Sequence, residues 1–113
     1  MEGRDEAGGQ QVLDDARALE AAGADVLLVE CLSAAVAARV REQTHRPLIG
    51  IGAGADCDGQ ILVLQDMLGI TPGQPPRFSH DFLADTGRIQ TALEAYVEAV
   101  RTRQFPQLQH TFE

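Results

Sequence analysis

One glutamate stands where the sequence could place a catalytic carboxylate. Glu30 follows the aliphatic run Val26-Leu27-Leu28-Val29 and comes just before Ser33, a residue suited to begin a helix. This order predicts a strand that carries Glu30 at its carboxyl end, the rim where parallel barrels gather their catalytic groups. A carboxylate partly withdrawn from water there could act as a general base. The alternative is a structural role, in which Glu30 accepts backbone hydrogen bonds and braces a loop.

Three closely spaced glycines, Gly50, Gly52 and Gly54, could be interpreted as a dinucleotide fingerprint. That fingerprint needs a helix to open directly after the glycines, whereas residues 56–60 predict a turn followed by another strand. We therefore expect a strand-end loop whose backbone comes close to a ligand or to a neighbouring strand. Binding of a phosphate or a flavin by this loop is a further, weaker hypothesis.

The other residues that could bind metals or act as nucleophiles show no site pattern. The aspartates lack the glutamate that completes a calcium loop, and the histidines are far apart in sequence and lack paired zinc-ligand spacing. No sequence-local base activates the thiol beside Glu30, so buried structural cysteines are expected. We predict turn aspartates, solvated or core histidines and no metal ligands among Asp56, Asp58, Asp66, His45, His80, His110, Cys31 and Cys57.

Composition excludes several classes of function. The formal net charge is -8, with scattered basic residues, which leaves no basic stripe for nucleic acid and no polybasic patch for a membrane surface. Two cysteines outside any C-x-x-C pair, and no basic-then-apolar leader, are typical of a reducing cytoplasm. The apolar runs are far shorter than the roughly 20 residues of a membrane helix. We expect a soluble cytoplasmic protein.

Helices and strands are expected to alternate along the chain. Helical spacing of Val12, Ala16 and Leu19 predicts a helix over 5–22, with Gly23 as its cap. Further helices are expected from Ser33 and over 86–103, a packed loop over 78–82 and an irregular tail. Apolar runs without polar alternation predict strands buried on both faces. These strands are expected over 26–29, 48–51 and 61–64.

This order predicts an α/β domain of parallel β/α units, with strands covered by helices. Three parallel strands with open edges would make a poor free-standing sheet. Further strands are therefore expected outside this sequence.

An ordered set of motifs identifies a family resemblance along essentially the whole chain. The motifs are Leu27-Leu28-Val29-Glu30-Cys31, Pro47-Leu48-Ile49-Gly50-Ile51-Gly52-Ala53-Gly54, Asp58-Gly59-Gln60-Ile61-Leu62-Val63 with Asp66, Leu68-Gly69-Ile70-Thr71, Phe82-Leu83-Ala84, and Phe105-Pro106 with His110 and Phe112. Together they resemble ketopantoate hydroxymethyltransferase.

The resemblance implies a (β/α)8 TIM barrel, with residues 1–113 as the C-terminal half of its catalytic domain. The implied reaction transfers a hydroxymethyl group from 5,10-methylenetetrahydrofolate to 3-methyl-2-oxobutanoate, giving ketopantoate for pantothenate and coenzyme A synthesis. Mg²⁺ holds the 2-oxo acid in this family and stabilises the enolate as a Lewis acid. A strand-end glutamate, followed by cysteine in many relatives, takes the proton, and Glu30 falls on that position. The full-length family protein is a homo-oligomer, a decamer.

The sequence also departs from the family pattern. The family's metal-binding carboxylates and a lysine near the substrate belong to its first half, and no position here matches them. Met1-Glu2-Gly3-Arg4 resembles a run inside the family's chain, which suggests a truncated product or a misassigned start. The isolated chain is therefore expected to be inactive. The alternative is a non-catalytic remnant that acts only as an association module, through its strand edges and last helix.

Overall fold

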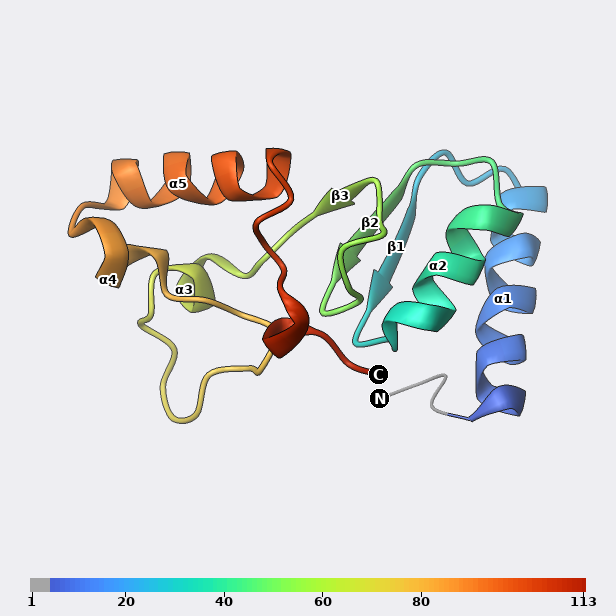
Figure 1. The fold of residues 1–113 in the computed structure, drawn as a ribbon. Coiled ribbons are helices and arrows are strands. Elements are labelled where there is room, and N and C mark those ends of the chain that lie inside the picture. Colours follow the sequence, from blue (N-terminus) through green and yellow to red (C-terminus); the bar gives the residue numbers. More distant parts are fainter. Residues whose placement is uncertain (1–4) are drawn as a thin grey trace.

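The computed structural model describes residues 5–113, so the family-like opening at 1–4 lies outside the described residues. Helices and strands alternate in its first half, and helices alone follow (Figure 1). In chain order the elements are α1 (Glu6–Ala21), β1 (Leu27–Glu30), α2 (Ala34–Gln43), β2 (Leu48–Ile51), β3 (Gly59–Gln60), α3 (Leu64–Met67), α4 (Phe82–Thr86), α5 (Ile89–Arg101) and the 3-10 helix η1 (Leu108–His110).

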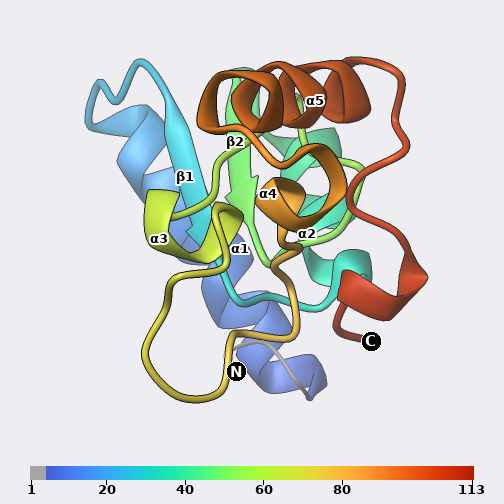
Figure 2. The same cartoon turned by 90° about the vertical axis from the view of Figure 1, so that its left-hand side faces the viewer.

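The three strands form one parallel sheet in the order β1-β2-β3. Leu27 pairs with Leu48 in the register of the first two strands, and Ile49 pairs with Gly59 in that of the next two. Helices α1 and α2 lie together on one side of the sheet, while α3, α4 and α5 gather at the opposite end of the molecule (Figures 1 and 2). The predicted α/β architecture with parallel strands and covering helices is confirmed.

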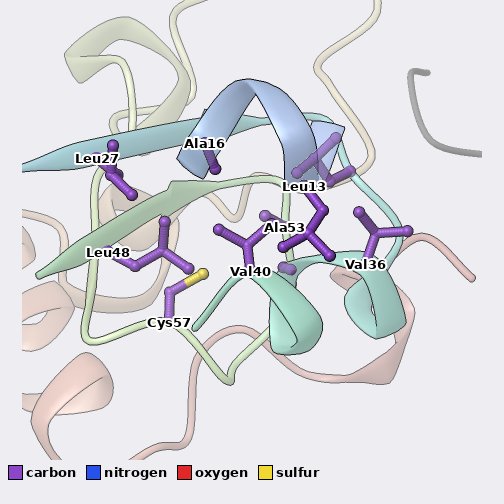
Figure 3. Packing of buried hydrophobic residues seen from close by; sticks show 10 residues of the cluster. Leu13, Ala16, Leu27, Val36, Val40, Leu48, Ala53 and Cys57 are labelled. Carbon is purple, nitrogen blue, oxygen red and sulfur yellow. The ribbon is translucent and has the colours of Figure 1, made fainter. Parts of the chain in front are cut away.

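The main hydrophobic core lies between the sheet and helices α1 and α2. Leu13 from α1, Val40 from α2 and Leu48 from β2 are its largest fully buried side chains, and they converge in Figure 3. The prediction for the apolar side of α1 was partly wrong, because Leu13 and Ala16 are buried there while Leu19 is 57% exposed. A second, smaller core joins α3, α4 and α5.

The predicted start of α2 and the predicted glycine after α1 are confirmed. The Ser33 hydroxyl oxygen accepts a hydrogen bond from the Val36 backbone N–H at 3.3 Å, so it caps α2. Gly23, just after α1, has φ +106°, a conformation that costs glycine little.

No helix within residues 5–113 is long and apolar enough to cross a membrane.

The prediction that β1 is buried on both faces was wrong for the described residues. Side chains alternate between the two faces of a strand. Leu27 and Val29 pack into the core under α1 and α2, but Leu28, on the other face, is 59% exposed. The cause is that the helices of residues 5–113 cover this part of the sheet on one side.

The predicted third strand is shorter and lies earlier. Pairing with β2 is confined to β3, and the last hydrogen bond of this ladder runs from the Ile61 N–H to the Gly50 carbonyl. Ile61 and Val63 are then 44% and 50% exposed, and Leu64 begins α3. β2 ends at Ile51 and offers no partner beyond that point, so the apolar run leaves the sheet.

The predicted helix over 86–103 is confirmed as α5, although it is shorter at both ends. Gly87, with φ +76°, ends α4 in a left-handed cap, and α5 begins two residues later. Phe82, expected in a packed loop, starts α4 and is buried in the second core with Ala92 and Phe105. The tail holds the short helix η1 where irregular structure was expected.

A compact loop, residues 52–58, joins β2 to its parallel neighbour β3. Such a crossover normally takes a dozen or more residues and contains a helix. Here Ala53 and Cys57 are buried in the main core, where a crossover helix would otherwise pack. A Cβ added to Gly50 would lie 2.6 Å from the Cys57 Sγ, so this crossover requires glycine at position 50.

Gly50→Ala is expected to lower the free energy of unfolding by about 2 kcal/mol, because the new methyl group overpacks the core. Cys57→Ala in the same chain should recover part of that loss, since it removes the sulfur while the Cys57 Cβ, 3.3 Å away, stays. Urea denaturation of both single variants and the double variant gives the coupling energy. Strictly additive losses would contradict this account of the crossover.

Candidate functional site

Glu30 is the last residue of β1 and lies opposite Ile51 of β2. Since Leu27 and Val29 face the core, Glu30 shares the opposite face with Leu28. The predicted position at the carboxyl end of a parallel strand is confirmed. The expected partial withdrawal from water is not seen within residues 5–113, where Glu30 is exposed.

The turn after Glu30 has a backbone conformation that few residues other than glycine adopt. Cys31 has φ +53° and its N–H donates to the Ile51 carbonyl at 2.9 Å. Such a residue costs about 1 to 3 kcal/mol and persists only where its surroundings hold it. Leu32 and Ser33, which follow, are both buried. The position of Glu30 therefore depends on a turn that neighbouring segments must fix.

The C-terminal tail is one of these segments. Phe112 forms a parallel bridge with Ser33, and its carbonyl accepts a hydrogen bond from the Ala34 N–H at 2.9 Å. Its ring meets Phe78 edge-on, with centroids 6.4 Å apart. Sequence reasoning did not place Phe112 beside Ser33, because 79 positions separate them and no local pattern links a tail to the turn after a strand.

The glycine loop packs against the same region. A Cβ on Gly52 would lie 2.7 Å from the Phe78 ring, and one on Gly54 would lie 2.8 Å from the Ala34 Cβ. Residues 55–58 form turns and no helix follows, so the dinucleotide interpretation was wrong. The loop backbone does come close to other segments, but these are the Phe78 ring and the start of α2, where a ligand or a neighbouring strand was expected.

Two histidines far apart in sequence lie side by side. The rings of His80 and His110 have centroids 6.0 Å apart, and His80 Nε2 is 2.7 Å from an Asp85 carboxylate oxygen. His110 is buried and its Nδ1 accepts from the Gln107 N–H at 3.1 Å. Burial and the neighbouring His80 lower the pKa of His110. Among the described residues, no three His, Cys, Asp or Glu side chains come together to bind a metal.

Asp58 has a structural role at the start of β2. Its carboxylate accepts from the Leu48 N–H at 2.8 Å and from the Arg41 Nε at 2.9 Å. Both contacts lower the pKa of Asp58, the backbone hydrogen bond most. Asp66 accepts from the Thr71 hydroxyl and is buried. The prediction of turn aspartates holds for Asp58, which lies in the loop before β3, and was wrong for Asp66, which lies within the short helix α3.

The two cysteines differ in their surroundings. Cys57 is buried, as predicted, and burial raises its pKa to about 11. Cys31 is partly exposed, so the expectation of a buried side chain was wrong there. Burial, followed by the charge of Glu30, raises the pKa of the Cys31 thiol. A raised pKa disfavours the thiolate that nucleophilic catalysis requires, so Glu30 is the better candidate for chemistry.

Parallel β/α units with a carboxylate at a strand's carboxyl end are the architecture of part of a (β/α)8-barrel protein. Residues 1–108 match the family model for ketopantoate hydroxymethyltransferase. The chain belongs to this family.

Relatives named 3-methyl-2-oxobutanoate hydroxymethyltransferase are similar to nearly the whole chain. The protein from Alkalilimnicola ehrlichii is 56% identical over 112 residues, which are 99% of this chain and 40% of the relative. That from Shewanella loihica is 53% identical over 112 residues, 99% of this chain and 42% of the relative. That from Methylobacillus flagellatus is 54% identical over 113 residues, 100% of this chain and 43% of the relative. The chain spans about two-fifths of the length of these relatives.

Proposed function

We propose that the chain forms the C-terminal half of an enzyme that transfers a hydroxymethyl group from 5,10-methylenetetrahydrofolate to 3-methyl-2-oxobutanoate, giving ketopantoate for pantothenate synthesis. The observation that carries the proposal is the position of Glu30, at the carboxyl end of β1 on the face turned away from α1 and α2. Family membership supports it, since the relatives are named for this reaction.

In the proposed mechanism Glu30 acts as the general base. A carboxylate oxygen takes the proton from C3 of the 2-oxo acid. Water releases the one-carbon unit from the two folate nitrogens as formaldehyde and leaves tetrahydrofolate. The electron pair left on C3 then forms a bond to the formaldehyde carbon, and the formaldehyde oxygen takes up a proton to become the hydroxyl group. The carboxyl end of β1 suits this role because a barrel interior there excludes water and directs the base at the substrate. Strands supplied by the rest of the protein would cover Glu30 and the exposed Leu28.

The family's Mg²⁺ does not fit the described residues alone. Mg²⁺ is bound by one or two carboxylates, with substrate and water completing an octahedron, and the strand-end carboxylate within residues 5–113, Glu30, already serves as the proposed base. Its ligands would have to come from the remaining three-fifths of a full-length protein. We assign to this chain the general base Glu30 and the turn that supports it. The full-length protein would be a cytoplasmic homo-oligomer that binds the 2-oxo acid and the folate.

The test is a chimera in which this chain replaces the matching segment of the Alkalilimnicola ehrlichii relative. At 56% identity the aliphatic positions of the sheet should remain compatible with the relative's strands. The chimera is expected to form ketopantoate from the oxo acid and the folate donor, and the isolated chain is expected to form none. A folded chimera without activity would contradict the proposal.

The alternative is a non-catalytic association module. It is favoured by an exposed apolar stripe along α5, formed by Ile89, Leu93 and Val97 at four-residue intervals. This function predicts that the isolated chain forms a defined oligomer in size-exclusion chromatography, whereas the chimera lacks transferase activity. The two measurements together separate the two functions.

A further inference from the structure

We infer that Phe112 is a positioning residue for the proposed reaction, because it fixes the turn that aims Glu30. The inference rests on the proposed function and extends it to a segment with no assigned role. Two contacts connect the tail to the segments that follow β1 and β2, and a third set of hydrogen bonds anchors the tail itself.

The first contact is made by the backbone. The Ala34 N–H lies in the first turn of α2, where the helix itself provides no acceptor. The Phe112 carbonyl accepts this hydrogen bond at 2.9 Å, and the two segments of the chain run in parallel where Phe112 bridges Ser33. The tail therefore acts as a short additional strand beside the residues that follow Glu30.

The second contact is made by the ring. Phe112 meets Phe78 edge-on, and the Phe78 ring fills the space beside Gly52 that a Cβ would occupy. The Arg77 guanidinium lies 5.9 Å from the Phe112 ring centroid. The ring thus connects the turn after β1 to the loop after β2, the two strand ends that border the site.

The third contact anchors the tail itself. The Thr111 hydroxyl donates to the Gln107 carbonyl at 2.7 Å, and the Gln107 N–H donates to His110 Nδ1 at 3.1 Å. Arg77 Nε donates to the Gln109 carbonyl at 3.3 Å. Because η1 is held from both sides, Phe112 reaches Ser33 from a fixed base.

These contacts matter because Cys31 is in a left-handed conformation directly after Glu30. Without the tail, the turn of residues 31–33 loses the hydrogen bond and the parallel bridge that Phe112 provides. Cys31 is then free to relax toward a common backbone conformation. That relaxation rotates the peptide group between Glu30 and Cys31 and weakens its hydrogen bond to Ile51. A small displacement of a catalytic group lowers the rate far more than it lowers substrate affinity.

The test ends the chimera after Thr111, with a chimera that ends after Phe112 as the matched control. In the control the terminal carboxylate of Phe112 still accepts from Ala34, and the ring stays. The chimera that ends after Thr111 is expected to show a kcat for C3 proton exchange that is about ten- to a hundredfold lower, while KM for the oxo acid changes by less than about threefold. Phe112→Tyr, which keeps the ring and the carbonyl, should retain the activity of the unaltered chimera.

Hydrogen exchange gives a readout of the contact itself. Loss of the Phe112 carbonyl should accelerate exchange of the Ala34 amide by about tenfold, with no change in the control. Faster Ala34 exchange with an unchanged kcat would overturn the inference and leave the tail a purely structural element. Failure of the unaltered chimera to exchange the C3 proton would instead overturn the proposed function, and this inference with it.

Discussion

Glu30→Gln in the chimera is expected to reduce exchange of the C3 proton of 3-methyl-2-oxobutanoate by about 10²- to 10⁴-fold, the contribution typical of a positioned general base. Glutamine has nearly the same shape, and Glu30 is exposed with no core contact to lose. The substitution therefore removes the proton acceptor and should leave the fold intact. Loss of the C3 proton signal in deuterium oxide, followed by proton NMR, measures the step without the folate.

The matched control is Glu42→Gln, which neutralises a different exposed glutamate, one that lies on α2. Both variants change the net charge equally, so a general electrostatic effect would appear in both. Exchange should fall only in Glu30→Gln, with unfolding midpoints alike. Undiminished exchange in a folded Glu30→Gln chimera would remove Glu30 from the mechanism and leave the structural interpretation, a glutamate that braces a loop.

The elements with strong local signals could be predicted from the sequence. Asp5 and Ser33 begin α1 and α2 with side-chain caps, and the run before Glu30 forms a strand that ends at that residue. These features depend on chemistry within a few residues: a hydroxyl or carboxylate that accepts a backbone N–H, and aliphatic side chains that fit a pleated sheet. The candidate base was found in the same way.

Features that depend on distant contacts could not be predicted. The run 61–64 has the composition of a strand, yet β2 ends too early to pair with it. In the loop 52–58, the small buried side chains of Ala53 and Cys57 fill the part of the core where a crossover helix would pack. No periodic pattern in the sequence predicts their burial. Phe112 reaches Ser33 only because the chain folds back on itself. In each case tertiary pairing, and not local preference, decides the structure.

The same distinction explains why the site is only half visible in residues 5–113. The position of Glu30 depends on β1 and β2, which this chain contains. We propose that strands of a full-length protein pair with the free edge of β1 and exclude water from the base; within residues 5–113 no strand pairs there. A strand end with an exposed apolar neighbour, Leu28, is the expected form of a barrel interior that other strands complete.

Gly54→Ala is expected to cause one of the largest losses of stability for a single methyl group in this chain, about 3 kcal/mol in the free energy of unfolding. Gly54 has φ +85°, which disfavours any side chain, and its added Cβ would lie 2.8 Å from the Ala34 Cβ and 3.3 Å from the Ala34 Cα. The second of these atoms is backbone at the start of α2, so relief requires the loop and the helix to separate.

Gly73→Ala is the matched control, because Gly73 has φ +78° and nothing lies within 4 Å of its added Cβ. Gly73→Ala is expected to lower the free energy of unfolding by about 1 kcal/mol, the cost of the left-handed conformation alone. The difference between the two variants in urea denaturation isolates the clash with Ala34. Ala34→Gly in the Gly54→Ala background should recover part of that difference, since it removes the nearer methyl group. Equal losses for Gly54→Ala and Gly73→Ala would show that the glycine loop does not press on the helix that follows Glu30.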